Sequence, residues 1–175
     1  MSSAPAGRLV GGRRNWFWIA AILVAGLDQL TKQLIPYATG DGFRAVLVPG
    51  FLRLISLRPN PRGAFSLGPD AVSFYVAATL AGLALIGWFF VTTPAQRRLP
   101  FIGLGSVCGG ALGNLIDRLL LGAVRDFIDM HWLDRAHWPT FNIADVGICV
   151  GVAVLIWEAV RPSGEADAEK PDTAQ

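Results

Sequence analysis

Four long apolar segments, separated by shorter polar ones, dominate the hydrophobic pattern of this chain. They cover residues 16–35, 71–91, 99–121 and 141–160. Each is long enough to cross a hydrocarbon core of about 30 Å as a helix rising about 1.5 Å per residue. The first segment could be a cleavable signal peptide, but it is long, contains Asp28 and Lys32, and lacks a small-residue cleavage site at its end. We therefore predict four retained membrane helices.

The region between the first two helices follows a different pattern. Two short β-prone runs, residues 43–48 and 51–57, flank the turn-forming pair Pro49-Gly50. They predict a small β-sheet on the membrane surface, within about residues 41–62. The pattern as a whole indicates a membrane all-α fold with this added sheet, in one domain over residues 1–162. The Glu-, Asp- and Ala-rich tail, residues 163–175, is expected to be disordered.

Composition supports a membrane protein. Of the 175 residues, 53% are hydrophobic and only 16% are charged, whereas soluble domains carry about 25% charged residues. The net charge of +2 gives no reason to expect a nucleic-acid partner. Four spans place both termini on one side of the membrane. Lys and Arg are divided almost evenly between the two sides, so the charges alone leave the orientation open.

Two aspartates frame the connection between the third and fourth helices. Asp126 lies just past the end of one apolar segment and Asp145 at the start of the next. A short polar loop between antiparallel helices would bring both carboxylates to the same membrane surface. Singly, Asp126 could be a turn acid, and Asp145 could be neutralised by Arg118 or Arg125. Together, two acids at the edge of the hydrocarbon predict a catalytic pair.

The same connection contains other polar residues. Asp129 and Asp134 are expected to be solvated acids. His131 and His137 could in principle bind a metal with a nearby acid, but their spacing does not match a zinc motif. Their tryptophan neighbours favour a place in the aromatic belt at the membrane interface. We therefore predict no metal and no cofactor.

Three polar residues within the helices are interpreted mainly as structural. Asp28 and Lys32 are four residues apart, so they share a helix face and can form an ion pair. Such a pair makes a charged helix tolerable in lipid. Asp117, in the third helix, is favoured as a brace to another helix.

A second group of polar residues could contact a substrate. Asn114 and Arg118 lie four residues apart on the same face of the third helix as Asp117. This face could either brace the third helix against another helix or contact a substrate, and the sequence leaves both roles equally open. Of its residues, Asn114 and Arg118 are favoured for substrate contact. Asn142 lies three residues before Asp145 and shares its face of the fourth helix.

Five motifs together resemble one known family. In chain order they are Asp-Gln-Leu-Thr-Lys (28–32), Asn-Pro-Arg-Gly-Ala-Phe-Ser (60–66), Gly-Gly-Ala-Leu-Gly-Asn-Leu-Ile-Asp-Arg (109–118), Val-Arg-Asp-Phe (124–127) and Phe-Asn-Ile-Ala-Asp (141–145). Their order and spacing resemble those of the lipoprotein signal peptidases (signal peptidase II), a bacterial family of membrane aspartic proteases. The resemblance extends from about Trp16 to Trp157.

The resemblance implies a role for each matched residue. Asp126 and Asp145 would be the catalytic dyad. The substrate site would be lined by four residues: Asn60, Asn114, Arg118 and Asn142. Three polar residues would support the fold: Asp28, Lys32 and Asp117.

The resemblance also implies an activity and a location. The enzyme would remove signal peptides from diacylglyceryl-modified prolipoproteins by cutting on the amino side of the lipidated Cys, without a cofactor. Its partners would be the prolipoprotein and membrane lipids, and we expect a monomer. The β-sheet would be extracytoplasmic, with both termini cytoplasmic and the active site at the periplasmic face of the bacterial inner membrane. The alternative class is a small transporter or channel subunit, whose acids would be spread through the depth of the membrane.

Two arginines depart from the family pattern. The family commonly has Gly in place of Arg62 and an apolar residue in place of Arg125. We predict that Arg125, next to Asp126 in sequence, favours an ionised dyad, because a nearby cation stabilises a carboxylate. Arg62 is expected to contact anionic lipid head groups instead.

Overall fold

The structure, a computed structural model, describes residues 7–39, 44–60, 71–95, 97–132 and 136–161. Its helices are α1 (Gly7–Thr39), α2 (Ala71–Thr92), α3 (Leu99–Leu121) and α4 (Ile143–Val160). Its strands are β1 (Arg44–Val48), β2 (Leu52–Asn60), β3 (Val124–Trp132) and β4 (Ala136–His137). All four helices are long and apolar enough to cross a membrane, as predicted. The predicted tail and Arg62 lie outside the described residues.

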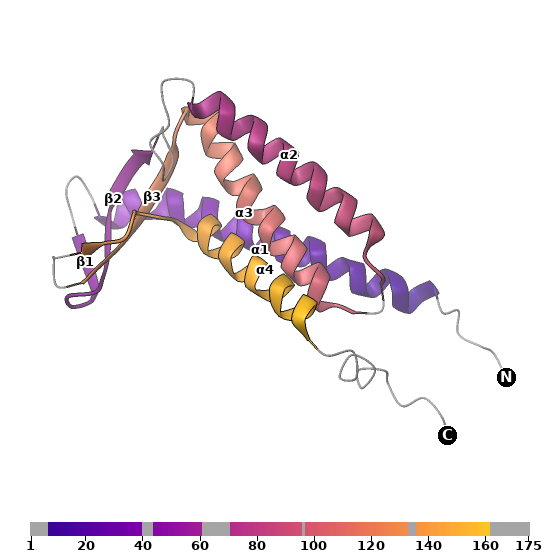
Figure 1. The fold of residues 1–175 in the computed structure, drawn as a ribbon. Helices are drawn as coiled ribbons and strands as arrows, with labels where there is room; N and C mark the ends of the chain where they lie inside the picture. The colour runs from indigo at the N-terminus through magenta and orange to yellow at the C-terminus, as the bar shows by residue number, and fades with distance from the viewer. Residues whose placement is uncertain (1–6, 40–43, 61–70, 96, 133–135, 162–175) are drawn as a thin grey trace.

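The four helices run alternately up and down, and the strands gather at one end of them (Figure 1). Helix α3 packs extensively against α1 and α4, whereas α2 packs mainly against α3. Glycines permit the close approach: a Cβ on Gly105 would collide with the backbone of Phe17 in α1, and one on Gly110 with the carbonyl of Ala144 in α4. Small residues at such contacts let helix backbones meet. Helix α3 is therefore the element that brings α1 and α4 together.

The ends of α3 have clear local causes. Pro100 lies in its first turn, where a missing backbone N–H costs no helical hydrogen bond. Gly122 follows its last residue with φ of 68°, and its N–H donates to the carbonyl of Arg118 at 3.1 Å. Glycine adopts this left-handed conformation without strain and so ends the helix. The chain then turns directly into β3.

The predicted hairpin is present. Strands β1 and β2 pair antiparallel, and Gly50 lies in the turn between them with φ of 71°. Strand β2 also pairs antiparallel with β3, and the two residues of β4 pair with the other edge of β3. The sheet therefore contains a strand from between the third and fourth helices, far from the hairpin in sequence.

The short polar loop that was predicted between the third and fourth helices is therefore wrong for much of this connection, where β3 and β4 lie instead. Strand β3 forms there because β2 supplies backbone hydrogen-bond partners, and such pairing is not visible in local sequence. Asp129 is not a solvated acid. It is only 4% exposed, and its Oδ2 pairs with Nε of Arg53 in β2 at 2.5 Å. His131 is also buried, at 6% exposed. Asp134 lies outside the described residues.

Candidate active site

A backbone bridge brings the two predicted catalytic aspartates together. The carbonyl of Phe141 accepts hydrogen bonds from the N–H groups of Phe127 and Ile128, and the Phe141 N–H donates to the Ile128 carbonyl. The chain that enters α4 therefore lies alongside β3, next to Asp126. Asp145 follows in the first turn of α4.

Asn142 links both carboxylates. It caps α4 with an extended backbone (φ of −136°); its Oδ1 accepts from the Asp145 N–H at 3.1 Å, while Asp145 Oδ2 accepts from the Asn142 N–H at 3.2 Å. This reciprocal arrangement is a capping box. With Oδ1 occupied in this way, Nδ2 points to the opposite side, where it donates to Asp126 Oδ1 at 2.8 Å. One fully buried asparagine thus binds Asp145 with its backbone and Asp126 with its side chain.

Asn114 of α3 completes this connection. Its Oδ1 accepts from Asn142 Nδ2 at 3.0 Å and from Lys32 Nζ at 3.2 Å, and its Nδ2 donates to Asp145 Oδ1 at 2.8 Å. An ammonium group can only donate, so Lys32 fixes which end of the amide faces it. The amide hydrogens of Asn114 consequently point toward Asp145.

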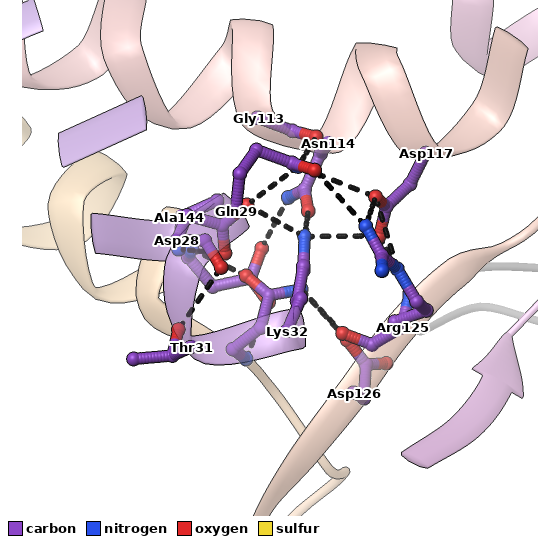
Figure 2. A network of polar contacts seen from close by, with 12 residues as sticks. Asp28, Gln29, Thr31, Lys32, Gly113, Asn114, Asp117, Arg125, Asp126 and Ala144 are labelled. Carbon is purple, nitrogen blue, oxygen red and sulfur yellow. Dashed lines mark hydrogen bonds and ion pairs between the residues drawn. The ribbon is translucent and has the colours of Figure 1, made fainter. Parts of the chain in front are cut away.

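A buried ion cluster lies behind these amides. Lys32 Nζ is 2.7 Å from Asp28 Oδ2 and 3.0 Å from Asp117 Oδ2, and all three side chains are fully buried. Asp28 Oδ1 also accepts the Ala144 N–H of α4 at 2.9 Å. Figure 2 shows this network joining α1, α3 and α4. The predicted Asp28–Lys32 ion pair is present, and Asp117 braces α3 to α1.

Arg125 belongs to this cluster and not to the dyad. Its Nη2 donates to Asp117 Oδ1 at 2.7 Å and to Gln29 Oε1 at 3.0 Å, and its Nε donates to Asp117 Oδ1 at 3.2 Å. Successive side chains of a strand point to opposite faces, so Arg125 points away from the carboxylate of Asp126. The guanidinium that was predicted to favour an ionised dyad is therefore bound by Asp117 and Gln29. The sequence analysis did not identify Gln29 as a partner in this cluster, although it lies between Asp28 and Lys32 in sequence.

Arg118, on the same helix as Asn114, is near enough to Asp145 and Asp126 for its charge to favour their ionised forms. Its guanidinium carbon lies 5.1 Å from the centre of the Tyr75 ring in α2. Stacking of this kind holds a guanidinium in place. Sequence reasoning missed Tyr75 because α2 contains no charge that would mark a polar site. Asn60 is the last residue of β2 and pairs with Val124 of β3. Its side chain is not among those that the structure describes.

Together, the fold and the site define a multi-pass membrane protein with a linked carboxylate pair where the helices meet the sheet. A family model described as signal peptidase (SPase) II matches residues 20–161. The chain therefore belongs to the signal peptidase II family, which confirms the resemblance seen in its motifs.

Individual relatives agree with this assignment. The chain is 38% identical over 141 residues to the lipoprotein signal peptidase of Syntrophotalea carbinolica, covering 79% of this chain and 86% of that one. It is also 38% identical over 165 residues to that of Cellvibrio japonicus, covering 91% and 95%. A solved bacterial membrane enzyme, 30% identical, superimposes with a TM-score of 0.73 over 83% of this chain and 92% of that one. These comparisons give no support to the transporter alternative.

Proposed function

We propose that this protein is an aspartic endopeptidase that removes signal peptides from diacylglyceryl-modified prolipoproteins, cutting on the amino side of the lipidated Cys. Its relatives are lipoprotein signal peptidases. The observation that carries the aspartic mechanism is the double contact of Asn142, which binds Asp126 through its side chain and Asp145 through its backbone. Two carboxylates that are bound by the same asparagine can act as one acid–base unit.

The proposed mechanism follows from two adjacent carboxyl groups. Two such groups do not both ionise readily, so they share one proton. The ionised aspartate takes a proton from a water molecule, and that water attacks the scissile carbonyl carbon. The protonated aspartate donates a hydrogen bond to the carbonyl oxygen and then supplies a proton to the departing amine. We propose Asp126 and Asp145 for these roles, which the pair fulfils as a unit.

Neighbouring side chains would orient the reactants. We propose that Arg118 and Asn60 contact the substrate, with Arg118 placed by Tyr75 on the side of the dyad. Asn114 and Asn142 were also expected to line the substrate site. Because both amides already hold the carboxylates, we propose that their first role is to orient the dyad. Correct orientation can supply a large part of a barrier reduction.

The arrangement of the helices supports an orientation in the membrane. The start of α1 and the end of α4 lie at the end of the molecule opposite the sheet (Figure 1). The pair Arg13-Arg14 precedes the apolar part of α1, and arginines close to a span favour the cytoplasmic side. We propose cytoplasmic termini, with the dyad at the periplasmic face of the inner membrane. A monomer would suffice, because one chain supplies both carboxylates.

Cleavage of a lipidated prolipoprotein by purified protein, followed by gel shift, tests the proposal. Asp126→Asn and Asp145→Asn should each abolish cleavage, because an amide cannot exchange the proton. Asp129→Asn is the matched control, since Asp129 is a buried carboxylate on the same strand that pairs with Arg53 instead. Its folded fraction should retain turnover. Substantial cleavage by either dyad variant would refute the aspartic mechanism.

A further inference from the structure

Arg125, the residue before the proposed catalytic Asp126, is held by contacts of both its side chain and its backbone. Its guanidinium donates to Asp117 Oδ1 and to Gln29 Oε1, and its own backbone N–H donates to Asp117 Oδ2 at 2.9 Å. The Arg125 side chain is 21% exposed and that of Asp117 is fully buried. Hydrogen bonds between a guanidinium and a carboxylate are charge-assisted and therefore stronger than neutral ones. Arg125 therefore ties the start of β3 to both α3 and α1.

This tie determines where the backbone of the next residue lies. On one side, Asp117 at the end of α3 holds residue 125 through both its backbone and its side chain. On the other side, the Arg125 carbonyl faces Asn142 Nδ2 at 3.5 Å. Asp126 follows immediately, and its side chain points to the opposite face of the strand, where Asn142 donates to it. Movement of residue 125 would move this carboxylate relative to Asp145.

Asp117 also connects Arg125 to the orientation of Asn114. Asp117 binds Lys32 and Arg125 at the same time. Lys32 in turn donates to Asn114, which donates to Asp145. Asn114 also accepts from Asn142, which donates to Asp126. The guanidinium of Arg125 thus stabilises one end of a chain of contacts that reaches both members of the dyad, although it touches neither carboxylate.

We infer that Arg125 is a positioning residue for the cleavage reaction: by binding Asp117 and Gln29, it holds β3 so that Asp126 faces Asn142. This inference rests on the proposed function. It gives the guanidinium no contact with the substrate and no direct charge effect on the dyad. Loss of the guanidinium should therefore lower kcat for cleavage, with KM and the pH dependence of kcat close to those of the wild type.

The test measures kcat and KM for a lipidated prolipoprotein in mixed micelles, per folded molecule, for Arg125→Met and Arg125→Lys. Arg125→Met should lose about tenfold to a hundredfold in kcat, the size of effect expected from a small misplacement of a catalytic group. Arg125→Lys should lose less, because it keeps a charge beside Asp117 but not the double contact. Arg53→Met is the matched control: it removes a partly buried ion pair between β2 and β3 at Asp129. It should reduce the folded fraction while leaving kcat unchanged.

Several results would overturn the inference. One is an unchanged kcat in folded Arg125→Met, and another is a rise in KM with kcat intact, which would indicate substrate contact. If Arg125→Met does not fold, Arg125→Lys decides by the same two measurements: a lowered kcat supports the inference and an unchanged one refutes it. Asp126→Asn is run in parallel. Its inactivity, combined with a normal kcat for Arg125→Met, would overturn the positioning role alone, whereas an active Asp126→Asn would overturn the proposed function.

Discussion

The ammonium group of Lys32 donates a 3.2 Å hydrogen bond to Oδ1 of Asn114, and this contact connects the buried ion cluster to the proposed catalytic pair. The same ammonium forms ion pairs with both Asp28 and Asp117. A residue whose sequence position indicates only an ion pair within one helix therefore also sets the orientation of an amide in another helix.

Replacing Lys32 with Met should mainly impair folding. The change leaves two fully buried carboxylates without this cation, and removing one partner of a buried ion pair costs about 3–5 kcal/mol. Folded yield and thermal stability in detergent should fall more than the turnover of the protein that folds. The double variant Lys32→Met/Asp28→Asn should recover part of the loss, because it removes a carboxylate with the cation. A normal yield with abolished turnover would instead assign Lys32 a direct catalytic role.

Changing Asn114 to Asp should reduce turnover more than changing it to Leu. Both variants remove the Nδ2 group that donates to Asp145, but only Asn114→Asp places another carboxylate against the carboxylate of Asp145. Asn114→Leu should lower kcat by about tenfold to a hundredfold through loss of orientation. Asn114→Asp should be slower still at neutral pH and should recover as the pH falls, because a protonated carboxyl can again donate to Asp145. An Asn114→Asp profile parallel to that of the wild type would contradict this role.

Asp145→Asn should be less stable than the wild type. Asp145 accepts hydrogen bonds on both oxygens, from the Asn114 side chain and from the Asn142 backbone, so an amide at this position must place its NH₂ against a donor. A lost hydrogen bond that leaves a buried group unsatisfied costs about 1–3 kcal/mol. Thermal unfolding of this inactive variant, side by side with the wild type, measures the difference, and equal stabilities would argue against the described capping box.

Gly105→Ala should weaken the packing of α1 on α3. The added methyl group would collide with the backbone of Phe17, and overpacking of this kind costs about 1–3 kcal/mol. Gly87→Ala in α2 is the matched control, because nothing lies within 4 Å of the position its Cβ would take. The control should be neutral or slightly stabilising, since Ala favours a helix over Gly. Equal melting temperatures for the two variants would show that the α1–α3 contact tolerates separation.

Features that depend on neighbours along the chain could be predicted from the sequence. The four helices follow from continuous apolar runs, which match the thickness of a bilayer whatever the helices pack against. The Asp28–Lys32 pair follows from helical periodicity, and Gly50 provides the turn of the hairpin. The family motifs also predicted that Asp126 and Asp145 come together.

Features that depend on partners distant in sequence were decided by the tertiary structure. Residues 124–132 form a strand because β2 is available to pair with them, and that pairing buries Asp129 against Arg53. Arg125 was expected beside Asp126, but the alternation of side chains in the strand directs it to Asp117 and Gln29. Tyr75 meets Arg118 only because α2 packs on α3. Local sequence determines which segments become helices. The partner of a buried charge depends instead on which distant segments the packed helices and the sheet bring within hydrogen-bonding distance.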